Sequence, residues 1–227
     1  MARVIITIPV PGGNVPAFTT PFTLRVVPAD PELLADIVAV GRKSGVLTDD
    51  QVGALRKVPQ VVEAELAFEK SGDRAAAAAA RLAADAFSAG ATAVFVETSL
   101  RVFGADTLTG AELDDAHTLF HLFVEVLLDD EAHEVVTEGL QCFDLPDVRV
   151  PFAADDPESA EAAQAAAFSL AAQMVCDRLR PQSGGVFRAS ESAPWYRLRL
   201  EPADPLEAAE DPFVNPRGSW RLTPRTA

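Results

Sequence analysis

Hydrophobic and acidic residues alternate most clearly over residues 61–69, which read VVEAELAFE. A period of two is typical of a strand with one face in the core and the other in water. An alanine-rich stretch follows from about Arg74 to Ser88 and predicts a helix that ends before Gly90. The apolar residues 92–96 (TAVFV) then predict a buried strand. Strand, helix and strand in this order predict a βαβ crossover in which the two strands are parallel.

Two strands are also predicted near the N-terminus, over residues 4–10 and 22–27, because both runs are apolar and rich in β-branched residues. The sequence PGGN at residues 11–14 indicates a turn between them. We therefore expect these strands to pair as a hairpin. Two helices should follow, the first with its N-cap at Asp30 and the second with a capping box that begins at Thr48.

The segment 112–128 fits two patterns. Residues 119–128 are apolar and suit a strand, which would turn at 129–131 and return over 132–141 as an antiparallel hairpin. A helix that begins at Glu112 is the alternative, because apolar positions in the same segment also recur at helical spacing. We expect the hairpin and keep the helix open.

A long helix is predicted from Pro157 to about Leu179, and a last strand over residues 195–200. In that strand Leu198 and Leu200 should point inward, with the arginines between and before them outward. Residues 202–227 are rich in proline and acid, and we expect a tail that packs back through Trp220. The prediction is therefore one α+β domain over residues 1–201, with a mixed sheet, a βαβ unit and hairpins, and helices packed largely on one face.

Composition limits the compartment and the partners. The chain has 227 residues with 48% hydrophobic and 23% charged residues, which is ordinary for a globular protein. Its formal net charge of -15 argues against nucleic acid or a membrane surface as the main partner, because phosphate contacts need lysine or arginine. Two distant cysteines and no apolar run long enough to span a bilayer favour a cytoplasmic protein.

The acidic residues are unevenly distributed. Between Arg101 and Arg178 there are seventeen Asp and Glu and a single arginine, Arg149. Such a segment can simply be a solvated surface, but it can also dock a basic protein partner. The binding residues that we predict are Asp129, Asp130, Glu131, Glu134, Arg197 and Arg199. Arg197 and Arg199 have an alternative role as cross-strand partners of Glu63 and Glu65.

A second candidate site contains two of the three histidines. His117 and His121 are four residues apart, and Glu125 follows four residues later. On a helix this spacing places both imidazoles on one face, which is a metal-ligand arrangement that a nearby carboxylate could complete. Thr118 stands where a zinc peptidase motif would have glutamate, so an exposed polar stripe is the other interpretation.

Other catalytic and cofactor motifs are missing from the sequence. There is no glycine-rich phosphate loop, no G-x-S-x-G sequence and no basic cluster that would activate Cys142 or Cys176. We expect no cofactor. The expected function is a non-enzymatic protein-protein interaction domain of adaptor or immunity type, with a metal-dependent hydrolase that uses His117, His121 and Glu125 as the alternative.

Three segments carry a resemblance to a known family. They are GATAVFVETS (90–99), EGLQCFDLPDVRV (138–150) and NPRGSWRL (215–222). In their order, from residue 61 to residue 225, the chain resembles the bacterial domain-of-unknown-function 4261-type family. The resemblance implies an α+β fold and a terminal strand or anchor at Trp220, and it implies no catalytic residues.

Overall fold

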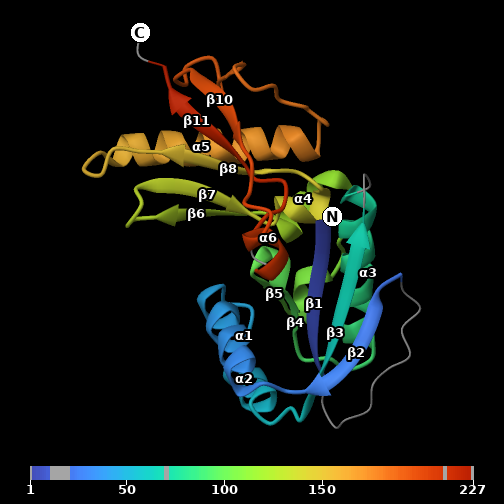
Figure 1. The fold of residues 1–227 in the computed structure, drawn as a ribbon. Helices are drawn as coiled ribbons and strands as arrows, with labels where there is room; N and C mark the ends of the chain where they lie inside the picture. The colour runs from blue at the N-terminus through green and yellow to red at the C-terminus, as the bar shows by residue number, and fades with distance from the viewer. Residues whose placement is uncertain (1, 11–20, 69–71, 212–213, 226–227) are drawn as a thin grey trace.

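The computed structural model describes residues 2–10, 21–68, 72–211 and 214–225. Two sheets form the framework, a five-stranded sheet in the order β2-β3-β1-β4-β5 and a six-stranded sheet in the order β6-β7-β8-β11-β10-β9 (Figure 1). Helices pack on both sheets, so the predicted α+β class is confirmed.

In the five-stranded sheet, β3 is an interior strand that pairs with β2 on one side and β1 on the other. The strands of this sheet are β1 (Ala2–Val10), β2 (Thr23–Pro28), β3 (Gln60–Phe68), β4 (Val94–Val96) and β5 (Arg101–Phe103). The expected hairpin of the first two strands is wrong, because β1 and β2 both pair antiparallel with β3 and lie on either side of it. Val61 and Val62 are buried on opposite faces of β3, which suits a central strand. The predicted turn at 11–14 lies outside the described residues.

The predicted βαβ unit forms in a split version. It consists of β3, α3 (Gly72–Ser88) and β4. Both strands run antiparallel to β1, so they are parallel to each other as predicted, but β1 lies between them. The 3₁₀ helix η2 (Glu97–Ser99) follows β4 directly, and η3 (Ala105–Leu108) follows β5.

Helices cover both faces of the five-stranded sheet (Figure 1). One face holds α3, and the other holds α1 (Pro31–Lys43) and α2 (Asp49–Leu55), which pack on a separate apolar cluster that includes Phe95 and Val102. The predicted caps are present: Asp30 accepts a hydrogen bond from the Glu32 N–H at 2.9 Å. Thr48 and Gln51 form the capping box with distances of 2.8 and 3.3 Å.

The six-stranded sheet is mixed. Its strands are β6 (Glu125–Asp129), β7 (Glu134–Glu138), β8 (Asp147–Pro151), β9 (Val186–Phe187), β10 (Tyr196–Glu201) and β11 (Ser219–Pro224). β6 and β7 form the expected antiparallel hairpin. The strand does not begin at Leu119, however, because α4 (Ala116–Phe123) occupies that part of the segment and buries Phe120 and Phe123. The helix and the strand that were alternatives for residues 112–128 are thus both present, and the strand follows the helix.

The C-terminal residues complete the six-stranded sheet. β11 pairs parallel with β8 and antiparallel with β10, and Trp220 is 5% exposed. α5 (Pro157–Val175) packs over β6, β7 and β8 and ends before the predicted Leu179. In β10 Leu198 points inward as predicted, but Leu200, expected to do the same, is 40% exposed. A short helix, α6 (Glu207–Glu210), precedes β11.

One apolar core joins the two sheets. It contains Ile6 of β1, Ala79 of α3, Phe123 of α4, Leu170 of α5 and Leu222 of β11. The 3₁₀ helix η4 (Leu140–Phe143) packs against both α3 and β1 at this junction. Among the helices of the described ranges, none has the length and apolar character that crossing a membrane requires.

Candidate functional site

The outer face of the six-stranded sheet, opposite α5, carries five arginines. They occupy alternate positions on three neighbouring strands, with Arg149 on β8, Arg221 on β11 and Arg197 and Arg199 on β10, and Arg225 lies just after β11. Side chains at the intervening positions, such as Leu198 and Leu222, face the core. We call the five arginines the arginine face. Arg221 is half-buried and the other four are exposed.

The strand register places three of these arginines in one row. Arg199 lies directly opposite Arg221 in the antiparallel pair, and Arg221 is the register partner of Arg149 in the parallel pair. Like charges directly opposite one another destabilise a sheet. The row is therefore unfavourable unless carboxylates or another anion neutralise it.

Two glutamates neutralise part of the row. Glu134 of β7, only 8% exposed, pairs with Arg221 and lies 3.8 Å from Arg149. Glu201 lies 3.8 Å from Arg221. Five arginines against two carboxylates leave an excess of three positive charges in a chain whose net charge is -15. Within the described ranges, Arg197, Arg199 and Arg225 have no ion pair.

A shallow hollow lies over these last three arginines. It measures about 440 Å³ and is lined by Arg197, Arg199, Thr223, Pro224 and Arg225, with no carboxylate among them. Guanidinium groups stay charged at every physiological pH, and their paired N–H donors match carboxylate and phosphate oxygens. The hollow can hold an anion, but its lining offers no group that takes up or releases a proton near neutrality.

The same face of the sheet is acidic at its other end. Glu138 of β7 and Asp147 of β8 lie there, beside Glu97 of η2, around a cavity of about 20 Å³. Loss of solvation raises the pKa of Asp147 to about 7, although Asn215 donates to its carboxylate at 2.7 Å. Burial also raises the pKa of Glu138, and the charge of Glu125 adds to that shift.

Glu97 and Glu138 are half-buried at this acidic end. Burial raises the pKa of Glu97 despite a hydrogen bond from the Thr7 hydroxyl. The Oε2 atom of Glu138 is buried and accepts no hydrogen bond from the residues that the structure describes. The cavity has room for about one water molecule, which is too small for a substrate.

The predicted metal ligands are not gathered into one site. His117 and His121 are exposed on α4, where the His121 ring lies 6.1 Å from the ring of Phe168. Glu125 is on β6 and binds Arg101 at 3.3 Å. No three His, Cys, Asp or Glu side chains of the described residues form a group that could hold a metal ion. Metal binding by the two histidines stays a prediction.

The predicted acidic binding residues differ in their surroundings. Asp129, Asp130 and Glu131 are exposed at the β6–β7 turn, where Asp129 accepts hydrogen bonds from the N–H groups of Glu131 and Ala132 at 3.1 and 2.9 Å. Glu134, by contrast, is buried in the arginine network. The turn lies at the β6 edge of the sheet, away from β10.

The alternative role of Arg197 and Arg199 is wrong. Glu63 and Glu65 lie in the five-stranded sheet, where they pair with Arg25 at 3.0 Å and Arg3 at 3.9 Å. Arg197 and Arg199 lie in the other sheet. The two predicted arginines instead share a face with Arg149 and Arg221, which sequence reasoning missed because strands far apart in the chain bring them together. The local signals were arginines between apolar residues at 148–150 and at 220–222.

Comparison with protein-family models, with curated proteins and with solved structures finds no match for this chain. The resemblance to the domain-of-unknown-function 4261-type family therefore stays a prediction.

Proposed function

We propose that this chain is a non-enzymatic protein-interaction domain whose arginine face docks an acidic segment of a partner protein. The observation that carries the proposal is the row formed by Arg149, Arg221 and Arg199 across three adjacent strands. The row works against the stability of the free sheet, and an acidic partner would remove that repulsion. An adaptor or an immunity-type protein in the cytoplasm fits this activity.

The charge of the proposed partner is opposite to the one expected from the sequence. The acidic segment suggested a basic partner, but several of its carboxylates already hold arginines or cap helices, for example Glu134 and Asp156. The arginine face, in contrast, has unpaired guanidinium groups within the described residues. A protein segment fits better than nucleic acid, because a net charge of -15 repels a long polyanion.

The proposal is tested with a fluorescein-labelled peptide of alternating Glu and Asp, whose anisotropy is followed as the protein is added. The unaltered chain should bind the peptide, and high salt should weaken binding. The double variant Arg197→Glu/Arg199→Glu should lose at least about tenfold in affinity, because each charge-assisted hydrogen bond contributes roughly 1.5–3 kcal/mol.

The matched control reverses two charges elsewhere. Arg56 and Lys57 are adjacent and exposed just after α2. Arg56→Glu/Lys57→Glu changes the net charge by the same amount and should bind the peptide nearly as well as the unaltered chain. Equal losses in the two double variants would mean that only net charge matters. Tighter binding to a poly-lysine peptide, lost on Asp129→Asn/Asp130→Asn, would favour the basic partner instead.

A further inference from the structure

A second concave region lies beside α3, outside the arginine face. Two hollows of about 470 and 640 Å³ share Asp73, Arg74, Phe143 and Arg178, so they form one groove along the first turns of α3. Binding sites for small molecules usually have volumes of this order. The groove uses none of the residues of the arginine face.

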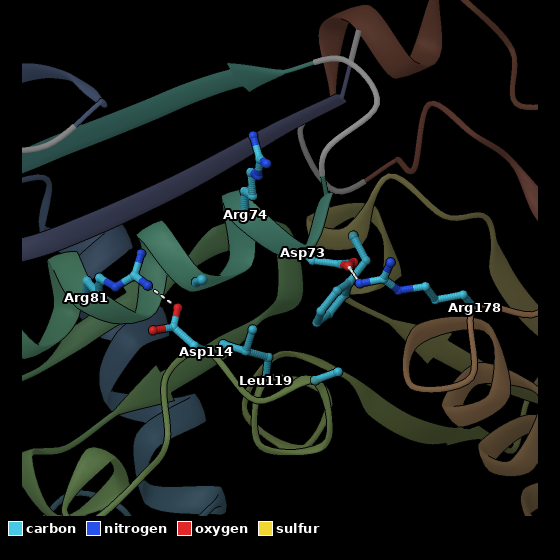
Figure 2. Close-up of a pocket in the computed structure, with 9 residues that line it drawn as sticks. Asp73, Arg74, Arg81, Asp114, Leu119 and Arg178 are labelled. Atoms are coloured by element: carbon cyan, nitrogen blue, oxygen red, sulfur yellow. Dashed lines mark hydrogen bonds and ion pairs between the residues drawn. The ribbon is translucent and has the colours of Figure 1, made fainter.

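Arginines reach this groove from one helix and from the turn after another. Arg74 and Arg81 belong to α3, and Arg178 and Arg180 follow α5. In Figure 2 Arg81 holds Asp114 on one side, Arg178 holds Asp73 on the other, and Leu119 lies between the two pairs. The Arg178–Asp73 distance is 3.4 Å, which is long for an ion pair with exposed partners.

Arg74 lines the groove without an ion-pair partner among the described residues. It is exposed, and it has no ion pair or side-chain hydrogen bond within the residues that the structure describes. Arg180 donates to the carbonyl oxygens of Met174 and Leu179 at 3.2 and 3.1 Å, which neutralises none of its charge. The N-terminal end of α3, a helix of 17 residues, adds a partial positive charge at the same place.

The floor of the groove is apolar. It consists of Ala77, Ala116, Leu119, Phe143 and Leu145. Leu119, Phe143 and Leu145 are 2%, 4% and 7% exposed, so the floor offers a small apolar surface that a ligand with an apolar body would cover. The lining thus combines a small apolar surface with four arginines and with three carboxylates, Asp73, Asp114 and Asp144, each of which is paired with an arginine.

The backbone around the groove is held in place on both sides. A Cβ on Gly72 would lie 1.9 Å from the carbonyl carbon and oxygen of Phe143, so the first turn of α3 rests directly on η4. Arg178 has φ 56°, in the left-handed region that a residue with a Cβ enters only at a cost. This position lies just after α5, where a residue in the left-handed region commonly ends a helix.

We propose that this groove binds a small phosphate monoester with an apolar body. The phosphate would lie against Arg74, Arg178 and the N-terminal end of α3, where Arg178 would keep its contact with Asp73 and donate its other N–H groups to a phosphate oxygen. A phosphate dianion has three oxygens for these donors and a carboxylate has two, which favours the phosphate. The apolar body would cover Leu119 and Phe143.

Phenyl phosphate is the probe for this proposal, and isothermal titration calorimetry is the measurement. The chain should bind phenyl phosphate more tightly than inorganic phosphate and should not bind phenol, because both the anion and the apolar body are needed. Arg74→Gln should weaken binding about tenfold or more, as expected for loss of a charge-assisted hydrogen bond. Arg197→Gln/Arg199→Gln on the arginine face should leave the affinity unchanged.

Arg178→Gly separates binding from folding. Glycine adopts φ 56° without strain, so this variant should unfold at the same urea concentration as the unaltered chain or at a higher one. It should nevertheless bind phenyl phosphate about tenfold more weakly or worse. Failure of phenyl phosphate to bind the unaltered chain, or an affinity of Arg74→Gln or Arg178→Gly equal to that of the unaltered chain, would overturn the proposal.

Discussion

At the residue scale, the protonation of Asp147 is coupled to folding. Its pKa is about 7 in the folded chain against an ordinary value of 3.8, because burial disfavours the carboxylate. The folded state therefore binds the proton more tightly than the unfolded state does. The contribution of Asp147 to stability is then most favourable below about pH 4 and declines as the pH rises toward about 7. Glu97 and Glu138 shift in the same direction.

The substitution Asp147→Asn tests this coupling. The amide has no charge to bury and can still meet Asn215 and Thr137, so the variant should be more stable than the unaltered chain at pH 8, by a few kcal/mol at most. At pH 4 the two proteins should unfold at nearly the same urea concentration. Asp155→Asn, at an exposed position, is the control and should show no such pH dependence. A variant that gains stability equally at both pH values would contradict the assignment.

At the element scale, the contact between α3 and η4 depends on a missing side chain. Gly72 begins α3, and a Cβ there would meet the Phe143 carbonyl group at 1.9 Å. Gly72→Ala must push the helix away from the turn and should destabilise the fold by about 1–3 kcal/mol, as overpacking does. Gly53→Ala in α2 meets no atom within 4 Å and should be neutral or slightly stabilising. Urea unfolding of both variants makes the comparison, and equal effects would rule out the tight contact.

The elements also show which features local sequence can predict. Helix starts at Asp30 and Thr48 were predicted correctly because a cap acts within three residues. The hairpin of β1 and β2 was not, because the choice between β2 and β3 as partner depends on burial of β3 on both faces. Residues 119–128 are apolar almost throughout, so period alone could not separate a helix from a strand that follow each other.

At the scale of the whole molecule, the candidate site forms because the sheet topology places β8, β11 and β10 side by side. Arg197 and Arg199 were predicted as binding residues from their clustering in the sequence, but their partners on the arginine face were not. The row needs β11 to enter the sheet between β8 and β10, where Trp220 and Leu222 are buried and Arg217, just before β11, pairs with Asp144 at 2.6 Å. The alternation of polar and apolar residues indicated on which face of the sheet each arginine lies. The pairing register of the strands determines which arginines lie next to one another.

A site built from facing like charges should reduce the stability of the chain that carries it. Arg199→Glu places a carboxylate directly opposite Arg221, which replaces a repulsive cross-strand pair by an attractive one. The variant should therefore be more stable than the unaltered chain by about 0.5 kcal/mol in low salt, and the gain should shrink as salt is added. Urea unfolding at two salt concentrations measures this gain.

The same variant should bind the acidic peptide more weakly, so stability and binding would change in opposite directions. Arg56→Glu alters the net charge equally but is the C-cap of α2 rather than a member of a cross-strand pair. Self-repulsion in a chain of net charge -15 should leave this control no more stable than the unaltered chain. If Arg199→Glu loses stability together with binding, the row supports the fold, and its repulsion is no evidence for an anionic partner.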